Sequence, residues 1–446
     1  MKLGVLLQYW DTRNDVRLLV EELARRFDVV LLAQERDRKA LEKSPYTVRY
    51  VGDRSWFWSR FWGYLFSIFG HIPRSERNYY IDEYFKLEWL KPAQKFRAGL
   101  MLQLSQILPK CFSFDAYARQ LAGQSCAELG DLDALLMVTE ICDPGTFGLA
   151  QRLGKPTAAY VYSWDHAPKH KRMSPKLDWY FTWNAPVGDD LVELQGVPPA
   201  RIRPVGSTQL VYVKDYLQNA PARQRKIPYD YVYFGCATGS PRFVEQEVRV
   251  IVWLANTLRE IAPEIKLLVR PYPFLGNWDL YAPLRSLTNV VFDDAFRHGA
   301  ESRALTREMM NEKFNRLEHA RAFVHLGTTL GFECAYFDTP MLFLAPQDFD
   351  FGLPRTDRMH LLNFFGQYHL EKYLELKKYP NVVAQQAGLR PALEAVLKSP
   401  RTMLAYGEEI RAVTPLRSLE EIVAGMVACL SHPSAALPKT RLHVPA

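Results

Sequence analysis

Residues 321–346 read RAFVHLGTTLGFECAYFDTPMLFLAP, and this stretch is the strongest indicator of the fold. An apolar strand from Ala322 to Leu326 runs into Gly327-Thr328-Thr329, a helix follows, and Pro340 to Leu344 forms a second buried strand. A Gly/Thr turn between strand and helix offers close backbone approach, hydroxyl groups and free N–H groups, which suits phosphate. Glu333, one turn into the helix, is placed to reach the hydroxyls of a ribose. An ordinary βαβ unit with a capped helix explains the segment equally well.

Strand and helix patterns alternate on both sides of this segment. The chain of 446 residues is too long for one core, so two domains are expected. Short buried strands separated by helices predict two Rossmann-like, doubly wound α/β domains that face a cleft. The predicted strands are 3–9, 29–32, 47–51, 134–138, 157–162, 179–183, 202–205, 231–234, 265–269, 290–292, 322–326 and 340–344. The predicted helices include 15–26, one from Pro144, 189–195, 241–261, 303–319 and 418–430.

The domain boundaries follow from composition. We predict an N-terminal domain over 1–212, interrupted by a mostly helical, aromatic-rich insertion at about 54–128. Residues 213–228 are polar, basic and proline-bearing, which is typical of a linker. The C-terminal domain is predicted over 229–415. Residues 416–446 then form a helix that crosses back to the first domain, and a tail.

Composition narrows the class of protein. Hydrophobic residues make up 48% and charged residues 24% of the chain, as in folded soluble proteins. The net charge of +7 fits an anionic substrate or membrane surface and does not by itself indicate nucleic acid. The six cysteines show no metal-ligand spacing, which predicts a reducing, cytoplasmic compartment. No signal-peptide cleavage region and no apolar run of about 20 residues are present, so we expect neither secretion nor a spanning helix.

Three loops of the second domain follow consecutive strands and are compatible with phosphate. Thr238-Gly239-Ser240 lies in a small-residue loop directly before a long helix. Arg270 precedes Pro271-Tyr272-Pro273, and Arg is the usual bidentate partner of phosphate. His325 begins the third loop, which continues into the glycine and two threonines already described. Each loop alone is also explained as a plain turn; their co-occurrence at one sheet edge favours a binding site.

In the first domain the run YVYSWDHAPK leaves a buried strand and ends in polar residues. Asp165 is the candidate general base that takes a proton from an acceptor hydroxyl, and His166 is the competing candidate. The alternative interpretation is that Asp165 caps a turn and that His166 is an ordinary loop histidine.

Residues 55–70, SWFWSRFWGYLFSIFG, form the aromatic core of the insertion. Ser55, Ser59, Gly63 and Ser67 recur every four residues, so a helix here has one narrow small-residue stripe and a broad aromatic face. Residues 54–110 contain nine Lys/Arg and four Asp/Glu. This pattern suits an in-plane helix, Trp56 to Phe69, on an anionic membrane surface. A helix buried between domains or in a dimer is the alternative.

No metal site is predicted. Acidic pairs spaced as Asp-x-Asp occur at Asp131/Asp133 and Asp348/Asp350. The first pair precedes a strand, at the edge opposite the expected cleft, and we rank the second low. A nucleophilic triad and a Walker-type loop are also absent from the sequence.

These motifs resemble those of GT-B glycosyltransferases, especially the bacterial enzymes of lipopolysaccharide, O-antigen and capsule assembly. The resemblance rests on VRPYP at 269–273, HLGTTLGFE at 325–333, DTPMLFL at 338–344, YSWDHAPK at 162–169, LDWYFTWN at 177–184 and VGSTQL at 205–210. It implies that a nucleotide-sugar donor lies against the second domain and an acceptor against the first, near Asp165. The donor-binding residues implied are Thr238, Gly239, Ser240, Arg270, His325, Gly327, Thr328, Thr329 and Glu333. Many relatives carry Asn where this chain has His166, which leaves open whether Asp165 or His166 is the base, or whether either only positions a sugar.

The function implied is a metal-independent glycosyltransferase without a cofactor besides its nucleotide-sugar donor. Its acceptor is expected to be a membrane-linked glycan or lipid, with the enzyme peripheral on the inner face of the cytoplasmic membrane. The alternatives are a sugar-nucleotide epimerase or polyol-phosphate transferase of the same architecture, or a non-catalytic nucleotide-sugar-binding protein.

Overall fold

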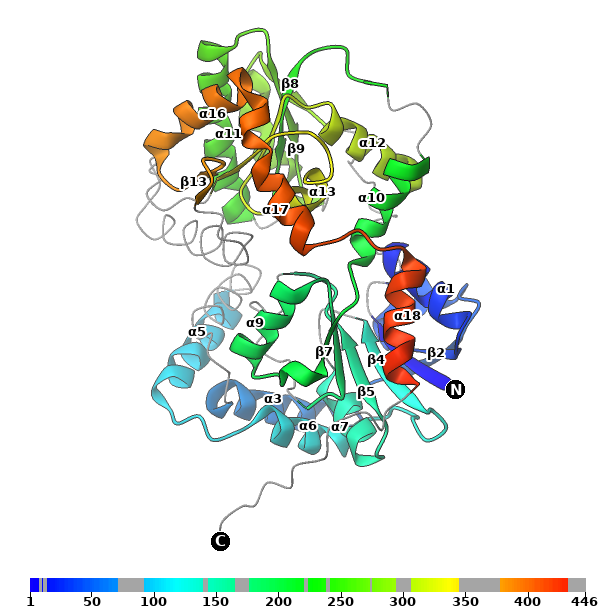
Figure 1. Cartoon of the computed structure of the whole chain (residues 1–446). Helices are drawn as coiled ribbons and strands as arrows, with labels where there is room; N and C mark the ends of the chain where they lie inside the picture. Colours follow the sequence, from blue (N-terminus) through cyan, green and yellow to red (C-terminus); the bar gives the residue numbers. More distant parts are fainter. Residues whose placement is uncertain are drawn as a thin grey trace. The chain divides into compact units, whose positions relative to one another are not determined.

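The computed structural model describes residues 1–7, 10, 14–70, 92–138, 143–164, 176–219, 224–237, 241–272, 275–293, 306–344 and 378–431. The chain forms two compact units (Figure 1). Unit 1 comprises Met1–Trp10, Asp15–Thr208 and Arg417–Ala446, and unit 2 comprises Asp11–Asn14 and Gln209–Leu416. Each unit is built around one parallel sheet, so the predicted α/β class with two Rossmann-like, doubly wound domains is confirmed.

The sheet of unit 1 has seven parallel strands in the order β3-β2-β1-β4-β5-β6-β7. Strands β1, β4 and β5 are almost wholly buried, as expected for apolar runs covered on both faces. The chain winds outward from β1 in one direction and from β4 in the other, which places a switch point between these two strands. The strands are β1 (Lys2–Leu7), β2 (Asp28–Gln34), β3 (Thr47–Val51), β4 (Ala134–Val138), β5 (Thr157–Tyr160), β6 (Trp179–Thr182) and β7 (Ile202–Pro204).

Side-chain caps fix where several helices of unit 1 begin. The Asp143 carboxylate accepts from the Thr146 N–H and starts α7. Asn184 caps α9 in the same way, so this helix begins four residues before the predicted Asp189. The helices are α1 (Asn14–Ala24), η1 (Glu35–Asp37), α2 (Arg38–Leu41), α3 (Trp56–Phe69), α5 (Pro92–Ile107), α6 (Phe114–Ala122), α7 (Pro144–Arg152), α9 (Ala185–Gln195), η2 (Pro199–Arg201) and α18 (Leu419–Leu430).

The last helix of the described chain, α18, belongs to unit 1. It begins with a complete capping box between Ser418 and Glu421. Gly206, with φ +112°, lies so close to Ile422 that a Cβ there would come within 3.2 Å of its side chain. The chain therefore returns to unit 1 after unit 2 is finished.

The sheet of unit 2 has six parallel strands in the order β10-β9-β8-β11-β12-β13. Winding again reverses once, between β8 and β11. The strands are β8 (Tyr231–Gly235), β9 (Lys266–Arg270), β10 (Val290–Phe292), β11 (Ala322–His325), β12 (Met341–Leu344) and β13 (Val382–Val383). The helices are α10 (Thr208–Asn219), α11 (Pro241–Ile261), η3 (Leu275–Ser286), α12 (Arg307–Glu318), α13 (Thr329–Cys334), η6 (Gln386–Gly388), α16 (Leu389–Lys398), η7 (Pro400–Met403) and α17 (Ala405–Val413).

The predicted linker over 213–228 differs from the structure in its first half. Residues up to Asn219 continue helix α10, and the division between units falls at Thr208/Gln209. The helix is held because Tyr216 packs against the rings of Phe314 and Phe337 and donates its hydroxyl to Glu318. These contacts come from distant parts of the chain, so local composition did not reveal the helix.

We expect Gly235→Ala to destabilise unit 2 by about 1–3 kcal/mol. A Cβ at the end of β8 would come within 2.9 Å of the Phe323 ring and 2.8 Å of a Leu330 methyl carbon. Gly407→Ala in α17 is the matched control, since its Cβ would meet only ordinary contacts of 3.5 Å or more. Urea unfolding should show a lower midpoint for the first variant and an equal or higher one for the control. Equal midpoints for both variants would contradict the tight packing at this strand end.

Candidate functional site

The candidate site lies at the carboxyl edge of the unit 2 sheet, where the winding direction reverses. The last residues of three neighbouring strands are aligned there: Gly235 pairs with Arg270 on one side and with His325 on the other. Ligands of open α/β sheets bind at such switch points because the two flanking loops diverge. The sequence-predicted loops after β8, β9 and β11 thus begin side by side. Of the first loop, Thr238, Gly239 and Ser240 lie outside the described residues.

The loop after β11 has the geometry of a tight turn. Gly327 has φ +103°, a conformation that side-chain-bearing residues rarely adopt. Its N–H donates to His325 Nδ1 over 3.1 Å, which folds the turn back onto the strand end. Thr328 caps α13, and both Thr328 and Thr329 are partly exposed. The two predicted threonines are therefore at the surface of the switch point.

His325 requires a correction, because its side chain is a core group and does not lie at the surface of the site. It is fully buried between the rings of Phe323 and Phe343, with centroids 5.2 and 5.3 Å away. Burial lowers the pKa of His325 to about 3, so the imidazole is neutral at physiological pH. It contributes by holding the Gly327 turn through Nδ1.

Glu333 lies one turn beyond Thr329, as predicted, in a buried position. One carboxylate oxygen accepts from Lys313 Nζ over 2.8 Å, and both side chains are only 5% exposed. The other oxygen, Oε2, is buried and has no hydrogen-bond partner among the described residues. A buried ion pair with an unsatisfied oxygen is costly, which marks Oε2 as an atom available to a hydroxyl donor.

Arg270 is buried at the end of β9 among other ionisable groups. Tyr233 donates its hydroxyl to Asp293 over 2.8 Å, and Arg316 Nε lies 2.9 Å from the other oxygen of that carboxylate. Burial raises the pKa of Asp293, while the positive charges of Arg316 and Arg270 oppose that rise. Arg270, the predicted phosphate partner, is therefore close to the Asp293 carboxyl group, which offsets part of its positive charge.

A second buried acid, Glu247 of α11, holds the first residues of the loop after β8. The Ala237 N–H donates to Glu247 Oε1 over 2.6 Å, and the Tyr281 hydroxyl lies 3.5 Å from Oε2. Burial raises the pKa of Glu247 to about 8, against hydrogen bonds from Ala237, Tyr281 and Cys236 that lower it. Glu247 is therefore mostly protonated at pH 7 and positions the loop as a neutral group.

Sequence reasoning missed Glu247 and Lys313, although a signal was present for each. Glu247 interrupts the buried stripe of α11 that Val244, Val248 and Ile251 define. Lys313 does the same between Met310 and Leu317 in α12. A charged residue on the apolar face of an amphipathic helix indicates a buried partner.

In unit 1, Asp165 and His166 lie outside the described residues. The described strand end before them is rigidly held: the Tyr162 hydroxyl donates to Asp15 over 3.1 Å, and the Trp183 indole donates to the Tyr162 carbonyl over 2.8 Å. Asp15 also accepts from the Thr208 hydroxyl over 2.8 Å. These bonds fix the position of the described residues that directly precede the candidate base.

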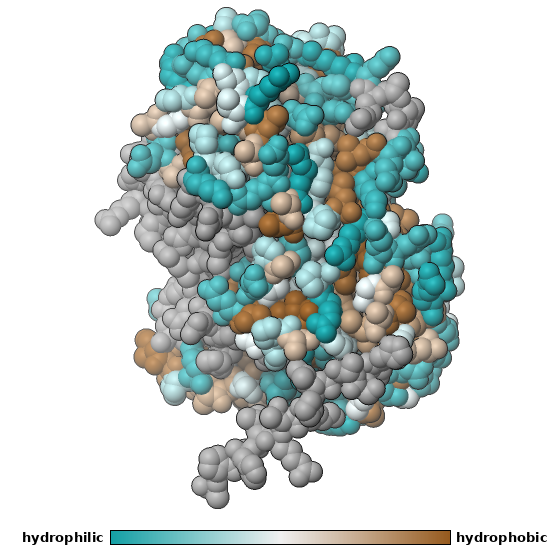
Figure 2. All heavy atoms as spheres, in the orientation of Figure 1, coloured by the Kyte–Doolittle hydropathy of each residue, from teal (hydrophilic) through white to brown (hydrophobic). Residues whose placement is uncertain are grey.

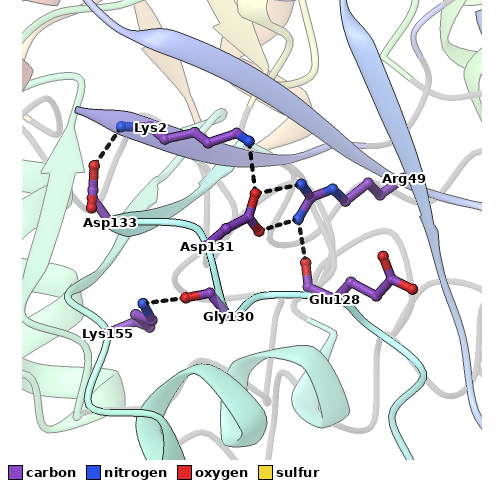
Figure 3. A network of polar contacts seen from close by, with 7 residues as sticks. All are labelled: Lys2, Arg49, Glu128, Gly130, Asp131, Asp133 and Lys155. Atoms are coloured by element: carbon purple, nitrogen blue, oxygen red, sulfur yellow. Dashed lines mark hydrogen bonds and ion pairs between the residues drawn. The ribbon is translucent and has the colours of Figure 1, made fainter.

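The acidic pair Asp131/Asp133 is occupied by cationic partners and backbone groups (Figure 3). Asp131 receives two hydrogen bonds from Arg49, of 2.6 and 2.7 Å, and one from Lys2 Nζ of 2.7 Å. These bonds hold the pKa of Asp131 far below its usual value. Asp133 accepts from the Lys2 backbone N–H over 2.6 Å. The pair therefore joins β1, β3 and the approach to β4, at the amino edge of the sheet.

Asp348 and Asp350 lie outside the described residues. Within the described ranges, no group of three or more His, Cys, Asp or Glu side chains is arranged to hold a metal ion.

Comparison with known proteins gave matches by structure alone. No family model and no curated protein matches the sequence. The UDP-GlcNAc 2-epimerase of Methanocaldococcus jannaschii is similar at TM-score 0.48 and 12% identity, covering 96% of this chain and 100% of that one. The Neisseria meningitidis UDP-GlcNAc 2-epimerase bound to UDP-GlcNAc has TM-score 0.48 and 11% identity, with 97% and 100% covered. CalG4, the calicheamicin glycosyltransferase, has TM-score 0.44 and 12% identity, with 99% and 98% covered.

We expect Glu247→Gln to change how the stability of unit 2 depends on pH. The folded-state pKa of Glu247, about 8, lies above the ordinary 4.5, so folding takes up a proton between these values. Wild-type stability therefore falls as pH rises from about 5 to 8, and this loss is absent when the group cannot ionise. The glutamine carbonyl can still accept from the Ala237 N–H.

Urea unfolding at pH 5, 6, 7 and 8 measures this effect. The stability of Glu247→Gln relative to wild type should increase by about 1 kcal/mol or more across the series. Glu245→Gln, at an exposed position of the same helix, is the control and should show a constant difference. Parallel pH curves for Glu247→Gln and wild type would show that this carboxyl does not titrate as described.

Proposed function

We propose that the protein is a glycosyltransferase that moves a sugar from a nucleotide-sugar donor to a membrane-linked glycan or lipid in bacterial surface-polysaccharide synthesis. The observation that carries the proposal is that the carboxyl ends of three adjacent strands, β9, β8 and β11, lie side by side at the switch point of unit 2. The loops that follow are the ones in which the sequence places groups suited to phosphate.

In this proposal the donor diphosphate lies over the switch point. Gly327 allows close approach of the backbone there, and the partly exposed Thr328 and Thr329 would offer their hydroxyls. The Thr238–Ser240 loop, whose preceding Ala237 is held by Glu247, would cover the other side. Arg270 adds positive charge beside them and would stabilise the leaving diphosphate, so a metal ion is not required.

Glu333 is assigned to the ribose. Its Oε1 is fixed by Lys313, which leaves Oε2 to accept a hydrogen bond from a ribose hydroxyl. Satisfying this buried oxygen supplies binding free energy that a deoxyribose analogue cannot supply. This predicts selectivity for ribonucleotides.

The chemical step is assigned to unit 1. Asp165, or His166 in its place, would take the proton from the acceptor hydroxyl as that oxygen attacks the anomeric carbon of the donor sugar. The bond from the sugar to the diphosphate breaks, and the nucleoside diphosphate leaves with its electron pair. A general base near the acceptor is needed because a sugar hydroxyl is a weak nucleophile.

A sugar-nucleotide epimerase is the competing assignment. Such an enzyme interconverts sugars while they are attached to, or briefly separated from, the nucleotide, and it consumes no acceptor. Incubating the protein with a panel of nucleotide-sugars, with and without membrane-lipid extracts, separates the two. Acceptor-dependent release of nucleoside diphosphate supports the transferase; an epimerised nucleotide-sugar formed without acceptor overturns it.

The role of Glu333 is tested by ligand binding. We expect wild-type protein to bind the best nucleoside diphosphate of a panel about tenfold more tightly than its 2′,3′-dideoxy analogue. Glu333→Gln should remove most of this preference, because the amide cannot accept at both positions. Lys313→Met is the comparison for general damage to the buried pair. Isothermal titration gives each affinity, and an undiminished preference in Glu333→Gln would contradict the assignment to the ribose.

The candidate base is tested by kinetics. Asp165→Ala should reduce transfer about 10²–10⁴-fold while the affinity for the donor nucleotide stays within about twofold of wild type. His166→Ala, its neighbour, is the matched variant, and the larger loss identifies the base. Unchanged transfer in both variants would remove the base from this loop.

A further inference from the structure

Helices α3 and α5 of unit 1 carry most of the large hydrophobic side chains that are exposed in the described chain. Nine large apolar side chains are exposed in the described chain. Seven of them belong to these two helices: Trp56, Phe57, Trp58 and Phe61 on α3, with Phe96, Leu100 and Ile107 on α5. The two helices pack against each other. Figure 2 shows hydrophobic atoms protruding at the lower left, where Figure 1 draws the end of α5. We call this surface, formed by these seven residues, the aromatic patch.

Helix α3, which carries four residues of the aromatic patch, packs against α6 of unit 1. At the other end of α3, Phe66 is buried and its ring stacks on Tyr117 of α6 at 4.6 Å between centroids. Gly63 faces the Tyr117 hydroxyl, where a Cβ would lie 3.6 Å away. The small-residue stripe of α3 thus packs against α6 at Gly63, while the aromatic rings in the first turns of α3 are exposed. Exposure of this kind on a fixed helix marks an interaction surface.

The two described segments that carry the aromatic patch contain charged residues of one sign only. The described segments 54–70 and 92–112 contain Arg54, Arg60, Lys95, Arg97 and Lys110, and no Asp or Glu. The four acidic residues of 54–112 all fall within 71–91, outside the described residues. The partner that this charge selects is therefore anionic.

Two of these arginines lie along the aromatic rings. The Arg60 guanidinium is 4.3 Å from the Trp56 ring centroid and donates to the Tyr64 hydroxyl over 3.0 Å. Arg97 of α5 lies 4.4 Å from the Tyr64 ring and joins the two helices. Guanidinium groups over aromatic rings place charge and apolar surface at the same level, as the headgroup region of a bilayer requires.

We propose that the aromatic patch docks unit 1 on an anionic lipid bilayer, with α3 lying in the plane of the membrane. With 14 residues, α3 is too short to cross a bilayer, and no helix of the described ranges is long and apolar enough to do so. Trp and Phe side chains supply the apolar contact, and the arginines supply attraction to acidic headgroups. This inference does not depend on the donor site of unit 2.

Vesicle co-sedimentation of the full chain tests the proposal. Vesicles of phosphatidylcholine with about 30% phosphatidylglycerol should bind the protein, and pure phosphatidylcholine should bind it at least tenfold more weakly. Trp56→Ser with Phe57→Ser should weaken binding about tenfold or more, with Leu153→Ser as the exposed apolar control. Arg54→Gln with Arg60→Gln should weaken it about 25-fold, and Lys39→Gln with Lys43→Gln is the charge-matched control outside the patch.

Each outcome decides between occupants of the aromatic patch. Loss of binding in both patch variants, with both controls unchanged, supports docking on lipid. Equal binding by the patch variants and wild type overturns it. Failure to bind anionic vesicles, together with a concentration-dependent dimer in sedimentation velocity that Trp56→Ser with Phe57→Ser abolishes, assigns the patch to a second copy of the chain and also overturns the proposal.

Discussion

The reversal of winding between β8 and β11 is the constraint on which the candidate site depends. All strands of unit 2 are parallel, so their carboxyl ends lie along one edge, and only at the reversal do the loops of adjacent strands turn to opposite faces. The register aligns Gly235 with His325 at that point. Burial of the His325 ring between two phenylalanines keeps the strand end fixed, and its Nδ1 then shapes the Gly327 turn. The positions of the surface groups of the site therefore depend on the packing of this core.

Much of the fold was predictable because its signals are local. Apolar runs identified every strand of both sheets except the two-residue β13, and Pro144 and Pro241 marked the first residues of α7 and α11. The errors occurred where distant residues decide the structure. Helix α10 occupies part of the predicted linker because Tyr216 packs against rings that lie about a hundred residues further along the chain.

The site was predictable as a set of loops but not as a set of side-chain environments. Pattern and spacing placed Arg270 at the end of one strand and Thr328 and Thr329 after another, and the sheet register places these two strands, β9 and β11, on either side of β8. They did not reveal that Glu333 is paired with Lys313 from another helix, or that a buried Glu247 holds the loop after β8. Charged pairs between helices depend on packing, and a single sequence contains no direct record of packing.

The central claim is that nucleotide binding belongs to the β8/β11 switch point of unit 2. Hydrogen–deuterium exchange of the full chain, with and without a saturating nucleoside diphosphate, tests it most directly, since bound phosphate and ribose slow the exchange of the amides that they contact. We predict slowed exchange in peptides covering 235–242 and 326–334. Nucleotide binding that leaves both peptides unchanged, or protects only peptides of unit 1, would contradict the account.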